Sequence, residues 1–452
     1  MTSKREVRTG PMRPVRILSV LGGGVAAIAV GAVALPAPVA AAATEVAASS
    51  RSDQSVADFY DERSGRPLWF AQSGRQVGAL LALLDSAQFD GLDPAQYRTS
   101  ALRRAVRATQ SGNLKAIRRA DRMLSEALVA YVRDLRRPAS VGVMYVDEEL
   151  RPAPPSAQAI LEAAARAASL ERWVADMRWM HPLYGELRQA LMNGSYTPEQ
   201  RDLIRINLER ARELPSNRKH VLVNAAAQRL SMYENGQVLD SMRVVVGKPI
   251  YPTPMMAALI RFAALNPYWY VPADLAAERI APNVLRHGLE YLRRQGYEVV
   301  SDFSPNPQIY DPTTIDWQAV ANGRQKILIR QQPGPQNSMG RIKFMFPNSA
   351  GVYLHDNPER ELFEQAARFY SGGCLRLEPA WRLSHWLFGR DLTWEGAGIE
   401  EKVPLAKAVP VYITYLTTVP DGSRIAFLDD VYGHDKERLA KQEDGELLAA
   451  SR

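Results

Sequence analysis

Hydrophobic residues in the first half of the chain recur at helical spacing. Leu80 to Leu84 form one apolar stripe, Leu124 to Tyr131 repeat every three or four residues, and Ile204 to Ala211 do the same. Such a period of about 3.6 residues predicts amphipathic helices, and strand-like alternation is absent from this part. We therefore expect an all-α domain over residues 53–215, with the proline-rich stretch 151–156 as a loop inside it.

From about residue 218 the hydrophobic period changes to two, which predicts strands. Two apolar runs, 229–233 and 237–242, flank the sequence Glu234-Asn235-Gly236, and Asn-Gly between such runs is a strong hairpin signal. Further strands are expected at 220–224, 326–330, 341–346, 351–355, 410–417 and 425–428, and helices at 274–297, 359–368 and 379–388. The predicted fold class is α+β, with a mostly β domain over 218–435 following the helical one.

The first 43 residues have the pattern of an export signal. Five basic residues and one acid lie within residues 1–16, residues 17–43 carry no charge, and small residues follow the apolar stretch. Cleavage near 40–43 is expected, and the alternative is an uncleaved inner-membrane anchor over 17–35. Both place the rest of the chain outside the cytoplasm, which predicts a periplasmic protein. At the other end, 436–452 is expected to be a charged tail.

Charge and composition exclude several functions. The chain carries a net +7, but residues 1–16 contribute +4, so the remainder carries only about +3 (7 − 4). A balance this small and scattered does not support nucleic-acid binding. The six histidines are dispersed without a paired metal-binding motif, so neither a metal nor a cofactor is expected.

Cys374 is the only cysteine in the chain, within Ser371-Gly372-Gly373-Cys374-Leu375-Arg376. An exported protein with one thiol has no intrachain disulfide, so a reactive thiol or an intermolecular bridge is expected. The alternative is a small, inert buried side chain. The preceding glycines favour the reactive thiol, because they let the backbone approach a substrate closely.

His355 ends a predicted strand upstream of this cysteine and suits a general base. The 15 residues between His355 and Ser371 allow one helix and a return beside the strand. Backbone N–H groups near Gly373 and Cys374 could then bind an oxyanion. An extended backbone would point Arg376 to the same side as Cys374, where it could bind a carboxylate. A structural histidine and a surface salt bridge are the competing interpretations.

This constellation resembles the signature of YkuD-type L,D-transpeptidases: a histidine, a spacer, Ser or Thr, Gly-Cys, an apolar residue, and Asn or Arg. The resemblance extends to the larger YcbB-like branch and covers most of residues 55–435. Two departures stand out: Gly372 replaces the usual His or Ser, and no peptidoglycan-binding module is evident between about 180 and 205. The other similar segments are 59–60, 69, 89–93, 207–212, 246–249, 253–254, 265–272, 332–344, 409–415 and 430–435.

The resemblance implies a scaffold domain, a β-sandwich catalytic domain and a lid over about 274–322. It also implies acyl transfer from a peptidoglycan tetrapeptide stem to a second stem, through a Cys374 thioester, giving a 3→3 cross-link. His355 would move the protons, while Ser371, Gly372 and Gly373 would orient the site and supply the oxyanion hole. Arg376, Tyr353 and Trp269 would hold the donor stem. Carbapenem inhibition and contacts with other cell-wall synthesis proteins are expected.

Three alternatives remain open at this level. The same chemistry could use water, a free D-amino acid or a protein lysine as acceptor. A non-catalytic wall-binding scaffold is a second alternative, and the intact set from His355 to Arg376 argues against it. A redox thiol switch is the third, and it would not need His355 or the glycines.

Overall fold

The computed structural model describes residues 56–71, 74–393, 400–422 and 424–441. The predicted export signal and residues 442–452 of the predicted tail lie outside these ranges. Within them, no helix has both the length and the apolar character needed to cross a membrane.

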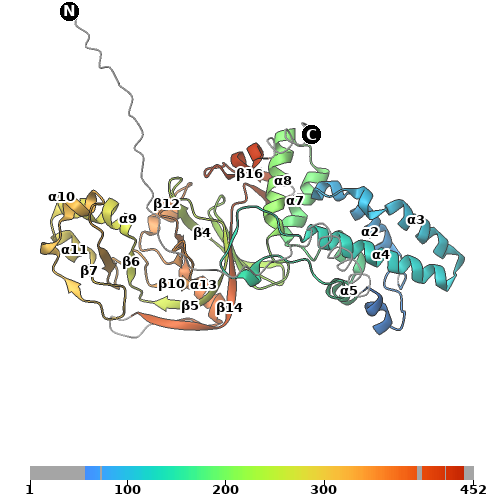
Figure 1. The fold of residues 1–452 in the computed structure, drawn as a ribbon, viewed down its shortest axis with the longest axis horizontal. Helices are drawn as coiled ribbons and strands as arrows, with labels where there is room; N and C mark the ends of the chain where they lie inside the picture. The colour runs from blue at the N-terminus through green and yellow to red at the C-terminus, as the bar shows by residue number, and fades with distance from the viewer. Residues whose placement is uncertain (1–55, 72–73, 394–399, 423, 442–452) are drawn as a thin grey trace, which may run out of the picture. The chain divides into compact units, whose positions relative to one another are not determined.

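The N-terminal region is helical, as the hydrophobic period predicts (Figure 1). Residues 56–62 form a first helix. Side-chain caps begin several of the others: Asn113 accepts two backbone N–H groups, and Thr197 forms a capping box with Gln200. The helices are α2 (Arg75–Asp85), α3 (Thr99–Ala108), α4 (Leu114–Leu135), α5 (Ala157–Arg166), α6 (Leu170–Ala175), α7 (Pro182–Asn193) and α8 (Pro198–Arg212).

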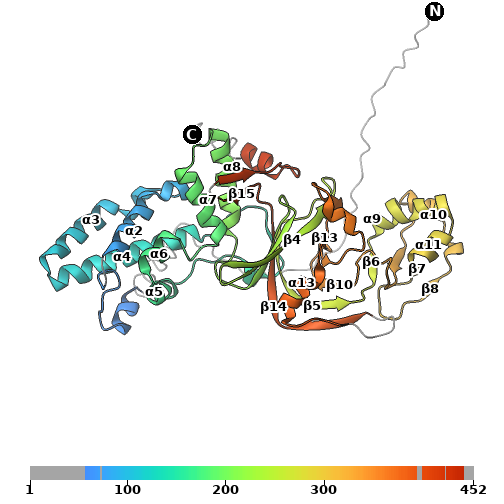
Figure 2. The same ribbon diagram turned by 180° about the vertical axis from the view of Figure 1, so that it is seen from behind.

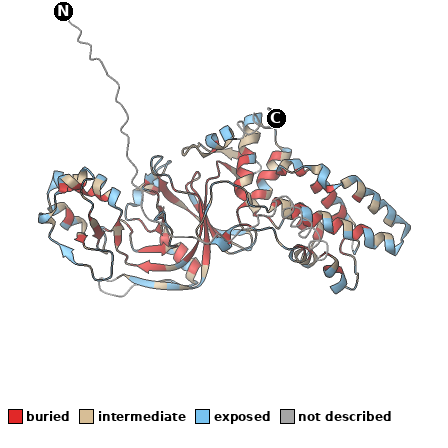
Figure 3. Ribbon diagram, viewed as in Figure 1, coloured by how far each residue is buried: buried red, intermediate tan, exposed pale blue. Residues whose placement is uncertain are grey.

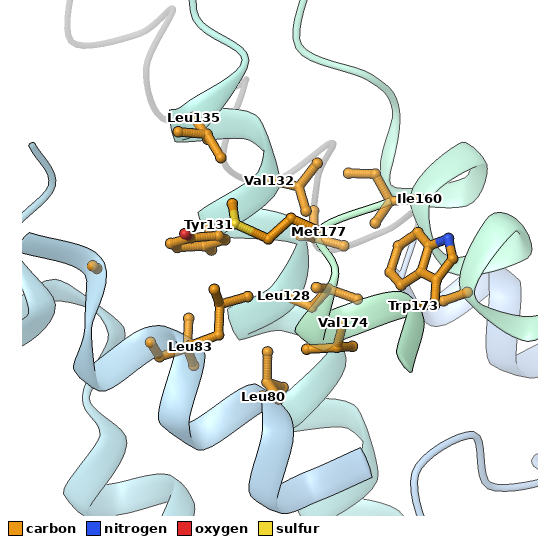
Figure 4. Packing of buried hydrophobic residues seen from close by; sticks show 14 of the residues in the cluster. Leu80, Leu83, Leu128, Tyr131, Val132, Leu135, Ile160, Trp173, Val174 and Met177 are labelled. Atoms are coloured by element: carbon orange, nitrogen blue, oxygen red, sulfur yellow. The ribbon is translucent and has the colours of Figure 1, made fainter. Parts of the chain in front are cut away.

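The predicted apolar stripes face each other in one hydrophobic core. Leu80 and Leu83 of α2 lie next to Leu128 and Tyr131 of α4, and Trp173 of α6 borders the same cluster (Figure 4). Buried carboxylates add fixed polar contacts beside this core. Asp90, 1% exposed, accepts hydrogen bonds from the Tyr131 and Tyr184 hydroxyls at 2.6 and 2.7 Å. It also forms an ion pair with Arg188 at 2.7 Å.

A large sheet makes up most of the second half. Its strand order β5-β10-β11-β13-β4-β3-β2-β14 closes into a ring, because β14 pairs with both β2 and β5. A short strand, β12 (Phe369–Ser371), adds to β4. The strands are β2 (His220–Asn224), β3 (Arg229–Glu234), β4 (Gln237–Gly247), β5 (Met256–Leu265), β10 (Ile342–Met345), β11 (Leu354–His355), β13 (Leu375–Leu377) and β14 (Glu401–Thr414).

The predicted hairpin joins β3 and β4. Asn235 and Gly236 form its two-residue loop, with φ of 54° and 75°. Positive φ at both positions is what a type I′ turn needs, and Asn-Gly accepts it at the lowest cost.

The helical region also contributes a strand that the sequence pattern does not reveal. β1 (Met144–Tyr145) lies between α4 and α5 and pairs in parallel with β5 of the large sheet. Two residues are too few to show alternation. The strand forms because β10 pairs only with Phe262–Leu265 of β5, which leaves the same edge open at Met256 and Ala257.

Two predicted elements are shorter than expected. Of residues 351–355 only the last two form a strand, because the Asn348 side chain bonds the backbone of Phe346 and Val352 in a local turn. Of residues 359–368 only Arg360–Glu364 is helical, as a 3₁₀ turn. In this segment the Arg368 guanidinium donates hydrogen bonds to the backbone carbonyls of residues 365 and 366.

The predicted lid is an insertion with its own sheet and core (Figure 2). Its sheet has the order β6-β9-β7-β8, so strands β6 and β9, outside the predicted range 274–322, bound it. We call residues 269–331 the lid insertion. Its elements are β6 (Trp269–Val271), α9 (Ala273–Leu275), a π-helical turn (Ala276–Ile280), α10 (Ala281–His287), α11 (Glu290–Gln295), β7 (Tyr297–Val300), β8 (Ile309–Tyr310), α12 (Trp317–Ala321) and β9 (Leu328–Gln331).

Buried polar contacts join α8 to the end of the large sheet. Asn207 donates to Thr417 at 2.9 Å, and Arg210 donates to the Tyr415 carbonyl at 2.8 Å and to Asp435 at 2.5 Å. Both side chains are buried, and Figure 3 shows how buried and exposed residues alternate along the helices. Residues 434–441, at the start of the predicted tail, are helical, and Arg438 pairs with Glu209.

Three further elements complete the second half. The predicted helix at 379–388 is α13 (Ala380–Phe388), and β15 (Thr418–Asp421) pairs with β16 (Arg424–Phe427).

Candidate active site

Three adjacent strands bring the candidate catalytic residues to one face of the sheet. His355 of β11 lies opposite Lys343 of β10 and opposite Arg376 of β13. Partners in register point to the same side, and Cys374 is two residues before Arg376, so Cys374 shares this face. Leu375, on the opposite face, is fully buried in the core of the sheet.

A tight turn holds Cys374. The Ser371 hydroxyl donates to the Cys374 carbonyl at 2.6 Å and accepts from the Gly373 N–H at 3.1 Å. Gly373 has φ of 112°, a conformation that side chains rarely adopt. Thr253 donates to the Gly373 carbonyl at 2.9 Å. The sequence GGC is therefore folded into one preorganised loop, in which Ser371 acts through its side chain.

Gly372 leaves room in this loop. It is exposed, and a Cβ at this position would meet only Leu275 of the lid insertion, at 3.8 Å. The lid insertion thus reaches the cysteine loop at this position.

The expected oxyanion donors differ in availability. The Gly373 N–H is already bonded to Ser371, whereas the Cys374 N–H has no hydrogen-bond partner among the described residues. Cys374 therefore offers the free backbone N–H, and the conformation of Gly373 sets the orientation of this N–H.

The Cys374 thiol is in its neutral form in this state. Burial raises the pKa of the thiol, against smaller effects in the opposite direction from the Tyr353 backbone and the Arg376 charge. The sulfur lies 3.6 Å from the Gly351 carbonyl, its hydrogen-bond acceptor.

His355 is neutral as well. Burial, together with the charges of Arg376 and Lys343, lowers the pKa of its imidazole to about 3. Nδ1 lies 2.6 Å from the Asp356 carbonyl, which can only accept. Nδ1 therefore carries the proton, and Nε2 is the basic nitrogen. Within the part of the chain that the structure describes, no hydrogen bond joins His355 to Cys374.

The three candidate substrate-binding residues have different surroundings. Arg376 forms an ion pair with Glu359 at 2.7 Å. Tyr353 is half-buried beside the thiol. Burial raises the pKa of its hydroxyl, and the negative charge that Cys374 would carry as a thiolate raises it further. Trp269 is only 8% exposed and packs near Tyr297 in the core of the lid insertion. It is thus a packing residue here, and its contact with substrate stays a prediction.

Lys343 belongs to this face, although the sequence pattern gave no reason to single it out. Its ammonium is buried, pairs with Glu400 at 3.4 Å and donates to the Tyr268 carbonyl at 3.2 Å. Burial lowers the pKa of its side chain. The only sequence signal is a lysine between the apolar residues of a predicted strand, which is also typical of a solvated strand face.

A cavity of 350 Å³ opens between the lid insertion and the strand that carries Arg376. The lid insertion and the segment after β9 supply one wall, and the segment after His355 supplies the other. The lining residues are Arg279, Tyr291, Gln295, Tyr297, Pro335, Gln336, Ser338, Asn357, Pro358, Glu359, Glu361 and Arg376. Among the described residues no cluster of His, Cys, Asp and Glu could hold a metal ion.

Comparisons with known proteins agree with this geometry. Residues 54–191 match the Scaffold domain family, and residues 218–400 match the L,D-transpeptidase catalytic domain family YkuD. A Haemophilus influenzae protein named "Putative L,D-transpeptidase" is 25% identical over 398 residues, which cover 84% of this chain and 78% of that one.

Solved structures are more distant. An L,D-transpeptidase from Mycobacterium smegmatis is 14% identical with a TM-score of 0.22, over 44% of this chain and 59% of that one. L,D-transpeptidase 1 of Mycobacterium tuberculosis is 17% identical with a TM-score of 0.17, over 44% and 62%. The match spans less than two thirds of either solved chain. The chain thus combines a helical Scaffold domain over residues 54–191 with a strand-rich domain over residues 218–400 that belongs to the YkuD family of L,D-transpeptidase catalytic domains.

Proposed function

We propose that the protein forms 3→3 cross-links in peptidoglycan, through a thioester on Cys374. The observation that carries the proposal is the shared face of Cys374 and His355, with the cysteine held in the loop that Ser371 closes. We also propose that it works in the periplasm, where the predicted export signal would place it.

The first step acylates the enzyme. The Cys374 sulfur attacks the carbonyl that precedes the terminal D-Ala, while the thiol proton passes to Nε2 of His355. The C–S bond forms, the carbonyl oxygen becomes an oxyanion, and the Cys374 N–H donates to it. When the C–N bond breaks, His355 passes this proton to the leaving amine of D-Ala.

The second step resolves the thioester. A side-chain amine of a second stem attacks the thioester carbonyl, and the C–N bond forms as the C–S bond breaks. The amine proton returns through His355 to the sulfur, so the enzyme ends as it began. Water, a D-amino acid or a protein lysine in place of the amine gives the alternative products.

The neutral resting state affects how the first step proceeds. A raised thiol pKa and a lowered imidazole pKa make a preformed thiolate–imidazolium pair unfavourable. Proton transfer is therefore coupled to the attack on the bound carbonyl. The Cys374 N–H of the cysteine loop stabilises the negative charge that develops on the carbonyl oxygen.

The test uses the soluble chain from about residue 45 and a Cys374→Ala control, each incubated with disaccharide-tetrapeptides. We expect liquid chromatography with mass spectrometry to find dimers and released D-Ala for the wild type only. Tripeptide without dimers would point to hydrolysis, and an unchanged substrate with a folded protein would contradict the proposal. A carbapenem should add its mass to the wild type and not to Cys374→Ala.

A further inference from the structure

Two unpaired charges of opposite sign face the 350 Å³ cavity. Arg279 comes from the π-helical turn of the lid insertion, and Glu361 comes from the 3₁₀ turn after His355. Within the described ranges neither side chain forms an ion pair or a side-chain hydrogen bond. The other two charges of the cavity, Arg376 and Glu359, neutralise each other at 2.7 Å.

This arrangement suits a ligand that carries both charges. A simple anion would leave Glu361 unpaired, and a simple cation would leave Arg279 unpaired. A zwitterion can satisfy both, with charge-assisted hydrogen bonds at each end. The cavity volume is at the lower end of the range for ligand pockets, about 300 to 1,000 Å³, which fits a small group rather than a whole stem.

Neutral groups complete the cavity. Tyr291 and Tyr297 supply an aromatic wall, and Gln295 and Ser338 supply groups that can bond a peptide or an amide. The engagement of Arg376 by Glu359 leaves Arg279 as the available guanidinium, although the sequence alone points to Arg376 for a substrate carboxylate.

We propose that this cavity binds the side-chain end of the diamino acid in the donor stem, where an amine and a carboxylate share one carbon. The carboxylate pairs with Arg279, and the ammonium pairs with Glu361. This inference rests on the proposed function and adds to it a selection for the third residue of the stem.

The donor stem is favoured over the acceptor for a chemical reason. An acceptor amine must be deprotonated and must reach the thioester on Cys374. An amine paired with Glu361 is held as an ammonium, which cannot attack a carbonyl, and Cys374 is not among the residues that line the cavity. The donor's side-chain amine does not react, so the cavity can hold it.

The test measures binding in the Cys374→Ala background, so it does not depend on turnover. Two tetrapeptides are compared by calorimetry, one with 2,6-diaminopimelic acid and one with lysine as third residue. Arg279→Gln should weaken binding of the first about 10- to 100-fold and leave the second within twofold, because lysine has no terminal carboxylate. Glu361→Gln should weaken both.

Exposed charges outside the cavity give matched controls, Arg286→Gln in α10 and Glu364→Gln at the end of the same 3₁₀ turn, and neither should change the affinity. Three outcomes would overturn the inference: Arg279→Gln lowers the affinity for both peptides equally, neither variant lowers the affinity for either peptide, or neither peptide binds at all. The proposed function would be overturned by a different result. In that case the Cys374→Ala protein binds and discriminates between the two peptides as expected, but the protein with an intact Cys374 releases no D-Ala.

Discussion

Gly372 and Gly373 are neighbours, but the loop uses them differently. Gly373 has a left-handed φ of 112°, and its carbonyl and N–H are both hydrogen-bonded, whereas a Cβ on Gly372 would make only an ordinary contact with Leu275. The conformational freedom of glycine is therefore needed at only one of the two positions.

An alanine at each position tests this difference. Gly373→Ala should cost about 1 to 3 kcal/mol of folding stability, because a side chain is strained at that φ, and should slow acylation. Gly372→Ala should leave both nearly unchanged. Urea unfolding and carbapenem labelling give the two readouts, and equal effects in the two variants would contradict the loop geometry.

Ser371 should matter more for the reaction than for the fold. Ser371→Ala removes two hydrogen bonds within the cysteine loop, each worth about 0.5 to 1.5 kcal/mol. Acylation should fall about 100-fold, since small misplacement of a reacting atom has effects of that size. Ser371→Thr keeps the hydroxyl and should retain more activity than alanine. A full rate in Ser371→Ala would show that the loop holds Cys374 without it.

The thiol should be slow to alkylate at neutral pH. Because burial raises its pKa, the thiolate should become the major form only above the ordinary midpoint of about pH 8.5, and its small fraction below that should keep growing with pH. The rate of labelling by iodoacetamide, followed by mass spectrometry from pH 6 to pH 10, should rise throughout without a plateau near neutrality. A plateau below pH 7 would instead indicate a preformed thiolate–imidazolium pair.

At the scale of elements, the lid insertion behaves as a folded unit whose core includes Trp269. That tryptophan lies in β6 with Tyr297 of β7 beside it, and β9 pairs with both strands. The sequence alone suggests a substrate contact for Trp269, but its burial indicates packing as its main role.

Trp269→Ala should therefore loosen the lid insertion. Removal of a buried tryptophan costs about 3 to 5 kcal/mol, and hydrogen exchange should accelerate in β6, β7 and β9 while the amides of β4 and β5 stay protected. Tyr310→Ala, at an exposed position of β8, is the control. If exchange is unchanged and only the KM for the donor rises, Trp269 binds substrate directly.

Elements with strong local signals can be predicted from the sequence, whereas elements that depend on tertiary contacts cannot. The Asn235-Gly236 hairpin and the helices of the first half follow from local chemistry. β1 does not, because only the edge of β5 makes it a strand. In the site, the cysteine motif predicts roles for Cys374 and His355, and the structure places both on one face of the sheet. The pairing of Arg376 with Glu359 has no sequence signal, because it depends on the path of a loop.

At the scale of the whole molecule, two histidines lie between α7 and β2. His181 caps α7, His220 begins β2, and both are fully buried with their rings 5.4 Å apart. Tyr233 stacks on His220, and Tyr412 meets its edge. Neither Nε2 has a hydrogen-bond partner among the described residues. Burial lowers the pKa of His220 to about 4 and that of His181 well below its usual value.

Acid should weaken this junction. A histidine with a lowered pKa in the folded state binds its proton more readily when unfolded, so stability is lost as pH falls from about 6.5 toward about 4. For His220 alone the loss amounts to about 3 kcal/mol at the low end. Urea unfolding measured at several pH values should show it.

A variant separates this contribution from those of His355 and His434, whose pKa values are also lowered. His220→Gln should flatten the dependence of unfolding free energy on pH, whereas His287→Gln, at an exposed position, should keep the wild-type slope. Equal slopes in all three proteins would exclude His220 as the source.

The contacts of Asn207 and Arg210 bear on how this protein can be divided. Thr417 and Asp435 belong to the C-terminal half by sequence, yet their buried partners lie on α8. A fragment that starts at residue 218 would keep the carboxylate and lose the guanidinium, which leaves an uncompensated charge in what was an interior. The boundary at which the chain can be cut thus lies before α8, and a transplanted catalytic domain would need to carry this helix with it.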